Sequence, residues 1–332
     1  MTATDDFKKA IDLLKKTTSW LVTSHTRPDG DSVGSTKCMC EIAAQLGKEA
    51  KPLLLSPPAE WYKFIFNTPV PVLGNDIKIE DIQSGKFGKF DLVVIVDTNS
   101  YVQLADLDKW LKTSKVPVLV IDHHLTGDGL GTVEIVDPTA AATGEIVLDL
   151  LKSAKWKITP AIAEALYIAI STDTGWFRFD NTDARVMRNA SILIEQGAKP
   201  TEIYRKMYQN YSLARLKLLG KMFENLELHH DNKIAIMHIM RSDFDSTGAS
   251  GPDTEEFVNE SQRISSVKAS ALFVELKDGG VRCSLRSDGS IDVRKIAQKF
   301  GGGGHKVAAG VNLKFNYEQA KKVILEEIEK EL

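Results

Sequence analysis

The chain is poor in cysteine, has no excess of basic residues and contains no long apolar run. Its three cysteines are Cys38, Cys40 and Cys283. The first two are too close in sequence for an ordinary disulfide, so we expect packed or surface thiols in a reducing compartment. Lys and Arg number 42 against 45 Asp and Glu, a net charge of −3, which argues against a broad basic surface for long nucleic acids.

A membrane or secreted location is also disfavoured. No segment approaches the roughly 20 apolar residues that span a bilayer. The first residues, MTATDDFKKAIDLLKK, lack the cationic start and apolar stretch of a secretory signal. We therefore expect a cytoplasmic protein without a membrane partner. A length of 332 residues with 43% hydrophobic residues is typical of an ordinary globular protein of two domains.

In the first half of the chain, short β-branched runs alternate with helical patterns, which predicts an α/β fold with a parallel sheet. The runs LVVIV and VPVLVI are continuous and apolar, as in central strands that are covered on both faces. The strands are expected at residues 20–24, 51–55, 92–96 and 116–121. The helices are expected at residues 32–46, 144–152 and 160–171.

In the second half, helical periodicity at 184–197 and 201–228 gives way to strands and then to further helices. The later strands are expected at 234–240, 270–276 and 280–285, and the later helices at 292–300 and 317–332. His229-His230-Asp231-Asn232 interrupts both periods and is interpreted as solvated linker. This pattern predicts three parts: an N-terminal domain at 1–190, a helical connector at 191–230 and a smaller α/β domain at 231–332.

Acidic and imidazole side chains follow three of the predicted strands. HTRPDGD follows the first, Asp97 follows LVVIV, and Asp122-His123-His124 follows VPVLVI. Ligands of open α/β sheets bind at the carboxyl ends of the strands, so these groups are expected to converge. Asp173 closes an apolar helix that could dock at the same edge. Any one of these residues could instead be a helix cap, as Asp31 could be for its own helix.

Several carboxylates in one crevice repel one another and lose solvation, a cost that divalent cations remove. A His and Asp set without thiolates suits Mn²⁺, Fe²⁺, Co²⁺, Zn²⁺ or Mg²⁺, and mixed oxygen and nitrogen ligation favours Mn²⁺. The ligands are too numerous for one tetrahedral zinc. They therefore predict two divalent ions about 3.5–4 Å apart.

Five motifs in order resemble the DHH phosphoesterase family with its C-terminal DHHA1 domain, closest to its stand-alone oligoribonuclease and 3′-phosphoadenosine 5′-phosphate (pAp) phosphatase branch. They are HTRPDGD at 25–31, VDT at 96–98, DHH at 122–124, TDTGWF at 172–177 and GGGGHKVAAG at 301–310. DHH alone is a weak pattern, whereas the five span nearly the whole chain. The resemblance implies a catalytic N-terminal domain and a substrate-binding C-terminal domain.

The resemblance implies six metal ligands: His25, Asp29, Asp31, Asp97, His123 and Asp173. Among them, Asp97 is expected to bridge the two ions. His124 is expected to point at the scissile phosphate and to assist the leaving oxygen, with Asp122 orienting an imidazole. Arg27 lies between ligands and could contact phosphate or be a solvated loop residue.

In the C-terminal domain, consecutive glycines allow backbone N–H groups to converge on an anion. The resemblance implies that the glycine segment and an arginine in CSLRS bind the phosphate and base of a nucleotide, where arginine offers a bidentate fork or a stacking plane. The residues expected to bind substrate are Arg286, Gly302, Gly303, Gly304, His305 and Lys306.

The activity implied is Mn²⁺-dependent hydrolysis of short oligoribonucleotides to mononucleotides and removal of phosphate from pAp. The expected substrates are about two to five nucleotides long, because long polymers need an extended basic surface. A phosphodiesterase for cyclic di-AMP or its linear form pApA is the main alternative. Pyrophosphatase, RecJ-like exonuclease and non-catalytic nucleotide-binding regulator are less favoured. A homodimer is expected only from the base rate of symmetric oligomers.

Overall fold

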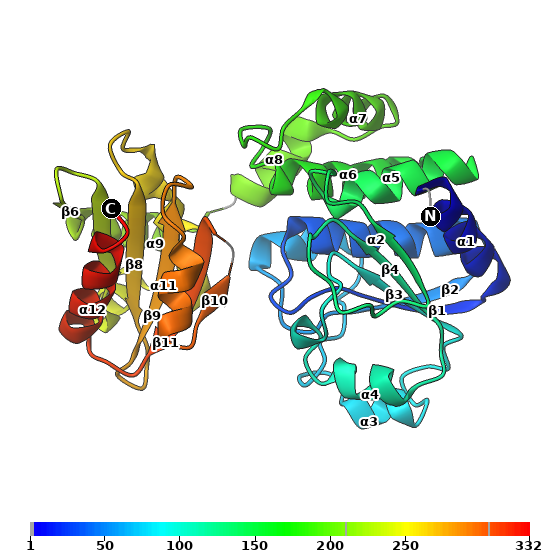
Figure 1. The fold of residues 1–332 in the computed structure, drawn as a ribbon, viewed down its shortest axis with the longest axis horizontal. Helices are drawn as coiled ribbons and strands as arrows, with labels where there is room; N and C mark the ends of the chain where they lie inside the picture. Colours follow the sequence, from blue (N-terminus) through cyan, green and yellow to red (C-terminus); the bar gives the residue numbers. More distant parts are fainter. Residues whose placement is uncertain (1–2, 210, 305) are drawn as a thin grey trace. The chain divides into compact units, whose positions relative to one another are not determined.

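The computed structural model describes residues 3–209, 211–304 and 306–332 and forms two compact units, residues 1–210 and residues 211–332 (Figure 1). Each unit has its own sheet and its own hydrophobic core. The predicted α/β fold, with a parallel sheet in the first half and a second sheet in the other, is confirmed. The finer division with a connector at 191–230 stays a prediction. Among the described residues, the helices are too short or too polar to cross a bilayer.

The first unit is built on a five-stranded parallel sheet in the order β2-β1-β3-β4-β5. Its strands are β1 (Ser19–Thr23), β2 (Glu49–Leu53), β3 (Leu92–Val96), β4 (Val118–Asp122) and β5 (Val133–Val136). Chain order reverses between β1 and β3, the position at which open α/β sheets bind their ligands. Since all pairings are parallel, the carboxyl ends of β1, β3 and β4 lie at one edge.

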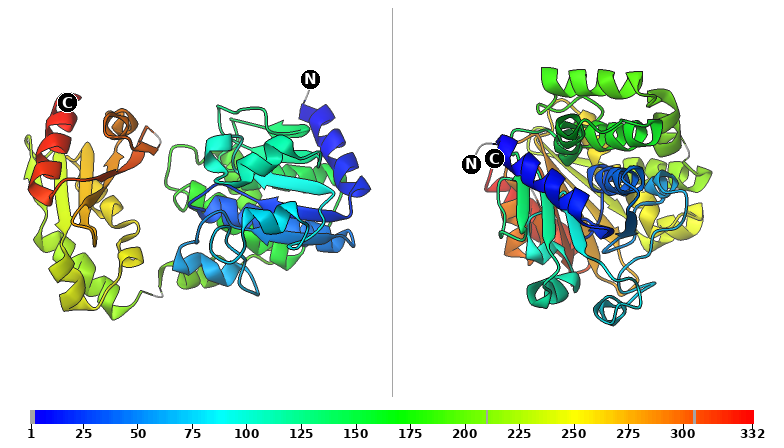
Figure 2. Two further views of the ribbon diagram at one scale, coloured as in Figure 1. Left: turned by 90° about the horizontal axis from the view of Figure 1, so that it is seen from below. Right: turned by 90° about the vertical axis from the view of Figure 1, so that its right-hand side faces the viewer.

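Helices cover both faces of this sheet, with α2, α5 and α6 on one face and α3 and α4 on the other (Figures 1 and 2). Alternate residues of β3 serve the two layers: Val94 packs in the α2, α5 and α6 core, and Val93 packs on the opposite side. The helices of the unit are α1 (Ala3–Lys16), α2 (Gly30–Gln45), α3 (Ile79–Gln83), α4 (Leu107–Thr113), α5 (Thr143–Ala154), α6 (Pro160–Asp173), α7 (Ala184–Glu195) and α8 (Pro200–Tyr208), with 3₁₀ turns η1 (Glu60–Ile65) and η2 (Tyr101–Gln103).

Helices α2 and α6 approach very closely because α2 carries a glycine at the contact. A Cβ added to Gly34 would lie 2.5 Å from the carbonyl oxygen of Ala165, well inside van der Waals contact. The apolar helix α6 is buried along most of its length and ends at Asp173. This close packing positions the end of α6 beside the start of α2.

The second unit has a six-stranded mixed sheet in the order β10-β11-β9-β8-β7-β6. Its strands are β6 (Glu227–His229), β7 (Ile234–Ile239), β8 (Ala269–Glu275), β9 (Val281–Ser287), β10 (Gly303–Gly304) and β11 (Ala308–Leu313). Its helices are α9 (Leu213–Glu224), α10 (Arg241–Thr247), α11 (Val293–Lys299) and α12 (Tyr317–Glu329), with 3₁₀ turns η3 (Gly251–Thr254) and η4 (Phe257–Arg263). Helices α11 and α12 pack on one face of the sheet, and α9, α10 and η4 on the other.

The region predicted to be helical at 201–228 is interrupted in the structure. Helix α8 ends at Tyr208, and α9 begins after Ser212, whose side chain accepts a hydrogen bond from the N–H of Arg215. The interpretation of His229 and His230 as linker is wrong, whereas the exposure expected of His230 is found. His229 ends β6, which pairs with β7 inside the second unit, and His230 is the first residue of the left-handed turn between these strands.

Candidate metal centre

The strand ends bring His25, Asp29, Asp97 and His123 to one edge of the first sheet. His25 and Asp29 follow β1, Asp97 follows β3, and His123 follows β4. Asp97 has a left-handed backbone (φ 64°), a conformation in which Asp and Asn are enriched among residues other than glycine. This turn directs the Asp97 carboxylate, which is almost fully buried, towards both histidines.

One potential ligand group consists of His25, Asp29 and Asp97. The Nε2 atom of His25 lies 3.2 Å from Oδ2 of Asp97 and 3.8 Å from Oδ1 of Asp29. The other ring nitrogen, Nδ1, lies 2.8 Å from the carbonyl oxygen of Thr26. Because a carbonyl can only accept, Nδ1 carries the hydrogen in the neutral ring and Nε2 presents a lone pair.

A second group consists of Asp31, His123 and Asp173. Nε2 of His123 lies 3.4 Å from Oδ2 of Asp173 and 4.0 Å from Oδ2 of Asp31. The same nitrogen is 3.5 Å from Oδ1 of Asp97. Nδ1 of His123 lies 3.3 Å from the carbonyl oxygen of Ala140, so Nε2 again presents a lone pair. The two oxygens of Asp97 thus face different groups.

These distances fit cation binding. Two donors that bind one ion at about 2.1 Å, roughly tetrahedrally or octahedrally, lie about 3–3.4 Å apart. An imidazole lone pair directed at a carboxylate oxygen is repulsive unless a proton or a cation lies between them. The atoms of each group are within 4.8 Å of one another, so one ion could contact all three members of either group.

Electrostatics lead to the same conclusion. Burial, together with Asp97 and Asp29, raises the pKa of Asp31 well above its usual value. The pKa of Asp97 is raised by burial and by the charges of Asp29, Asp173 and Asp122, and the pKa of Asp173 is raised in the same direction, first by burial. Burial lowers the pKa of His123, which favours the neutral, ligating form of its ring. A cation relieves the repulsion that, in addition to burial, raises the pKa values of these carboxyl groups.

Asp31 is held by the N-terminus of α5. Its Oδ2 accepts the N–H of Thr143 at 2.6 Å, its Oδ1 accepts the N–H of Gly144 at 2.9 Å, and Ser35 Oγ lies 3.2 Å from Oδ1. These donors stabilise the charge of a fully buried carboxylate. The alternative that Asp31 caps its own helix is wrong, because the residue that caps α2 is Asp29, which accepts the N–H of Ser32.

His124 and Asp122 form a pair beside these groups. Nδ1 of His124 lies 2.7 Å from Oδ1 of the buried Asp122, and this hydrogen bond raises the pKa of His124. The orienting role expected for Asp122 therefore has a geometric basis in His124. Asp97, His123 and His124 form a further set that could hold an ion, so the assignment of His124 to phosphate stays a prediction.

Known proteins resemble this chain in sequence and in fold. Residues 19–170 match the model of the DHH family N-terminal domain, and residues 231–332 match that of the DHHA1 domain. The bifunctional oligoribonuclease and PAP phosphatase NrnA of Thermus thermophilus is 30% identical over 317 residues, which cover 94% of this chain and 89% of the relative. The chain belongs to the DHH family. The resemblance deduced from the five motifs is thus confirmed.

Two further comparisons extend this result. NrnA of Bacillus subtilis is 28% identical over 303 residues, covering 90% of each chain. The crystal structure of an exopolyphosphatase-related protein from Bacteroides fragilis superposes with a TM-score of 0.92 at 24% identity, covering 98% of this chain and 96% of the other. The latter likeness shows the fold.

In the second unit, Arg286 lies in β9 with its guanidinium held from two sides. Its Nε donates to Oδ1 of Asn259 at 2.8 Å, and its Nη1 donates to the carbonyl oxygen of Leu285 at 3.0 Å. Burial lowers its pKa, although arginine remains cationic at any physiological pH. Asn259, in η4, was not anticipated from the sequence.

The glycine segment differs from the expected anion cradle. The N–H of Gly302 donates to the carbonyl oxygen of Ala297 at 2.9 Å, so this N–H already has a partner within the protein. The expected role of Gly302 in substrate binding stays a prediction. Gly302 is required for packing, because a Cβ would lie 2.4 Å from the carbonyl oxygen of Gly310. Gly303 and Gly304 form the edge strand β10, and Lys306 is exposed. His305 lies outside the described residues.

Several groups that hold the candidate ligands were missed in the sequence. The N–H groups of Thr143 and Gly144 and the carbonyl of Ala140 are backbone atoms, for which residue identity gives little signal. The hydroxyl of Thr143 lies 3.1 Å from Oδ1 of Asp97. Recognition of β5 in the sequence would have placed Thr143, at the start of the next helix, near the same edge of the sheet. Asn181, whose side chain contacts the carbonyl of Asp173, has no comparable signal.

Proposed function

We propose that the protein is a metal-dependent phosphoesterase that hydrolyses short oligoribonucleotides to mononucleotides and dephosphorylates pAp. The observation that carries the proposal is the pair of His and Asp groups that meet at the buried carboxylate of Asp97. The activities named for the relatives from Thermus thermophilus and Bacillus subtilis support the substrate class.

The proposed ligand sets are the two groups of the candidate centre. His25, Asp29 and Asp97 would hold one divalent ion. Asp31, His123 and Asp173 would hold the other, with Asp97 shared between the two. Two such ions, with Mn²⁺ the preferred pair, would supply positive charge to the attacking and leaving oxygens of an in-line displacement at phosphorus.

The protein's own groups position and protonate the substrate. The carbonyl oxygens of Thr26 and Ala140 keep Nδ1 protonated in His25 and His123, so that both Nε2 atoms are available as ligands. Asp122 holds the ring of His124 and favours its cationic form. His124 would then donate a hydrogen bond to the leaving oxygen or to a phosphoryl oxygen.

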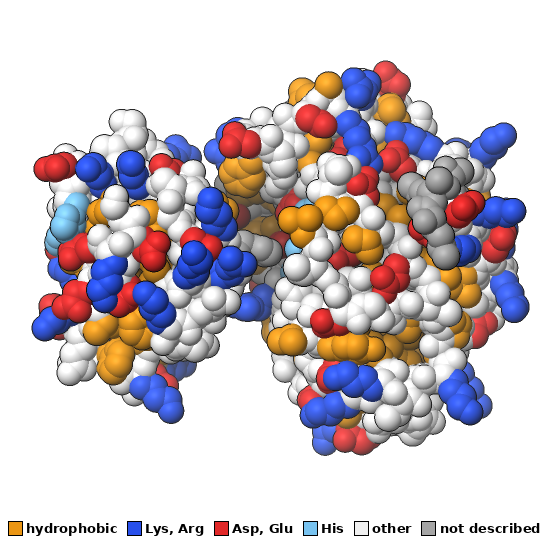
Figure 3. Space-filling view, in the orientation of Figure 1, with side chains coloured by type: hydrophobic (Ala, Val, Ile, Leu, Met, Phe, Trp, Pro, Cys, Tyr) orange, Lys and Arg blue, Asp and Glu red, His pale blue; other side chains and the backbone are white. Residues whose placement is uncertain are grey.

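Four residues of the second unit are proposed to bind the nucleotide: Arg286, Gly303, Gly304 and Lys306. The guanidinium of Arg286 is pre-oriented by Asn259, which lowers the entropic cost of gripping a phosphate. Short substrates are favoured because the charge of the chain is balanced. Figure 3 shows Lys and Arg side chains interspersed with Asp and Glu on the face it presents, rather than forming a continuous basic stripe among the coloured residues.

The test is a product assay with end-labelled RNA of two to five nucleotides, a 24-nucleotide RNA, pAp, pApA and cyclic di-AMP, each with Mn²⁺ or with EDTA. We expect release of mononucleotides from the short RNAs and adenosine monophosphate from pAp with Mn²⁺, with turnover abolished by EDTA and much slower on the long RNA. Absence of turnover of short RNA and pAp in both conditions would overturn the proposal. A much higher kcat/KM for cyclic di-AMP or pApA would reassign the substrate.

A matched pair of variants tests the assignment of Asp97. Asp97→Ala removes a carboxylate that faces both ligand groups and should reduce kcat/KM on the order of 1000-fold, since metal stabilisation of the transition state contributes several kcal/mol. Arg27 is exposed in the loop between His25 and Asp29, and Arg27→Ala should cost less than about tenfold. Similar losses for the two variants would contradict the bridging role.

A further inference from the structure

The turn that follows Asp173 has an unusual backbone. Gly175, Trp176 and Phe177 are all left-handed, with φ values of 55°, 58° and 62°. For Trp and Phe this conformation brings Cβ close to the following carbonyl oxygen and is disfavoured. Such a turn persists only where its surroundings hold it in place, and residues of this kind cluster at functional sites.

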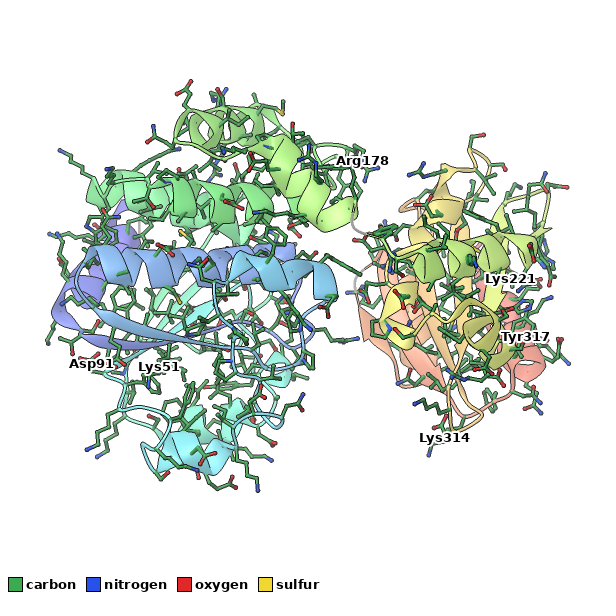
Figure 4. All side chains as sticks on the ribbon, turned by 180° about the vertical axis from the view of Figure 1, so that it is seen from behind. Lys51, Asp91, Arg178, Lys221, Lys314 and Tyr317 are labelled. Carbon is green, nitrogen blue, oxygen red and sulfur yellow. The ribbon has the colours of Figure 1, made fainter. Side chains whose placement is uncertain are left out.

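Aromatic packing and a hydrogen bond hold the middle of this turn. The ring of Trp176 packs edge-on against Tyr204 and Tyr208 of α8, at centroid distances of 5.0 Å and 5.6 Å. Nε of Arg178, labelled in Figure 4, donates to the carbonyl oxygen of Gly175 at 2.6 Å. The ring contacts join the turn to α8, and the hydrogen bond from Arg178 closes the turn on itself.

Asn181 connects this segment to the ligand groups. Its amide nitrogen Nδ2 lies 3.1 Å from the carbonyl oxygen of Asp173 and 3.2 Å from that of Ala141. An amide nitrogen carries two hydrogens, so one side chain can donate to both carbonyls at once. The segment that bears Asp173 is thereby tied to the loop between β5 and α5.

That loop already holds the other two members of the same ligand group. The carbonyl oxygen of Ala140 faces Nδ1 of His123, and the N–H of Thr143 binds Asp31. Ala141 lies between them in the chain. The Asn181 side chain is therefore linked to every member of the group formed by Asp31, His123 and Asp173. The link runs through backbone atoms of the β5–α5 loop and of Asp173. The carboxylate of Asp29 and the ring of His25 are held by other contacts, whereas Asp97, which faces both groups, accepts a hydrogen bond from the hydroxyl of Thr143.

We propose that Asn181 is a positioning residue that sets the distance of Asp173 from Asp31 and His123, and so sets the affinity of one of the two cation sites. This inference rests on the proposed metal-dependent function. Loss of the bridge lets the turn relax and moves Asp173 away from its partners. The site formed by His25, Asp29 and Asp97 is affected less, because His25 and Asp29 are held by contacts outside this loop.

The experiment measures Mn²⁺ bound per full-length chain by equilibrium dialysis, for wild type, Asn181→Ala and Asn181→Asp. Asp has the shape of Asn but presents no donors to the two carbonyls at neutral pH. We expect two ions on wild type. In both variants one ion should bind nearly as in wild type and the other about 10- to 100-fold more weakly, the range found when an outer partner of a metal ligand is removed.

Gln45→Ala is the matched control. The side-chain amide of Gln45 makes two hydrogen bonds to the backbone of Lys157 in the same unit. Its Nε2 donates to the carbonyl oxygen of Lys157, and its Oε1 accepts the N–H of Lys157, both at 2.9 Å. It lies at the end of α2 opposite Asp31, so its loss should leave both ions bound as in wild type. A general loss of folding would weaken both sites together and could not produce selective loss of one.

The outcomes separate the two proposals. If wild type binds no Mn²⁺, the proposed metal-dependent function fails. If wild type binds two ions and both Asn181 variants bind both ions with unchanged affinity, only the role of Asn181 fails. Equal weakening of both sites in the two variants, or the same selective loss in Gln45→Ala, also overturns the positioning role.

Discussion

Asp97 allows the charge of the candidate centre to be changed without changing its shape. Asp97→Asn keeps the volume of the side chain, keeps an oxygen for the hydroxyl of Thr143 at 3.1 Å, and tolerates the left-handed backbone at φ 64° as well as Asp does. The variant therefore removes one buried negative charge and little else. We expect opposite consequences for the metal-free and the metal-loaded protein.

Without metal, the charge of Asp97 destabilises the folded state. Its pKa is raised by burial and by neighbouring carboxylates, so the metal-free protein binds more protons when folded and loses stability as pH rises from about 4 through the raised value. Two unit charges about 5 Å apart repel by roughly 3 kcal/mol at an effective dielectric constant of 20. Since partial protonation and nearby imidazoles offset part of this, we expect Asp97→Asn to stabilise the metal-free first unit by about 1–3 kcal/mol.

The assay is calorimetric unfolding at pH 8 in EDTA and in Mn²⁺. For a unit of this size, each kcal/mol shifts Tm by about 2–4 °C, so the variant should melt roughly 2–12 °C above wild type in EDTA. Wild type should gain about 2.7 kcal/mol for each ion present at 100 times its Kd, whereas the variant should gain little.

A surface control separates the buried charge from charge removal in general. Asp106→Asn removes a carboxylate that is 63% exposed and paired with Lys109, and its effect on stability should stay within about 1 kcal/mol. A lower Tm for Asp97→Asn in EDTA, or a Mn²⁺-induced shift equal to that of wild type, would refute the electrostatic reasoning.

Two further predictions concern packing and substrate binding. Gly34→Ala should lower the urea midpoint by the equivalent of about 1–3 kcal/mol, because its Cβ would press on the carbonyl of Ala165. Gly220→Ala, in α9 with open space around it among the described residues, should be stabilising by about 0.5–1 kcal/mol; equal destabilisation of both would contradict the packing argument. Asn259→Ala should raise KM for a short RNA about 5- to 30-fold by releasing Arg286, equivalent to about 1–2 kcal/mol, and a fall in kcat at unchanged KM would contradict it.

The central strands were predictable from the sequence because each is a continuous apolar run that ends in polar residues. Leu92–Val96 is fully buried and matches its predicted bounds. The four-residue strand Val133–Val136 was missed, since only Ile135 is buried in it and its pattern is too short to indicate a strand. The helical prediction at 201–228 missed the break before α9 because periodicity continues across it.

Most of the candidate metal ligands could be identified from the sequence because they directly follow those strands. The groups that hold these ligands in position could not be identified in this way. Asp31 is bound by backbone N–H groups 112 and 113 residues away, and this contact depends on how α5 packs rather than on which residues it contains. Asn181 likewise acts on carbonyl oxygens. Hydrogen bonds to backbone atoms leave almost no trace in residue identity.

The cradle formed around Asp31 by the start of α5 limits what can replace this residue. Both carboxylate oxygens accept N–H groups from α5, one from Thr143 and one from Gly144. An amide has only one oxygen, so asparagine at position 31 would turn its NH₂ group against one of these donors in a site sealed from water. Exchange of Asp31 for asparagine would thus disturb the contact between α2 and α5 as well as the charge. A related protein with asparagine at this position should also have a different first turn of α5.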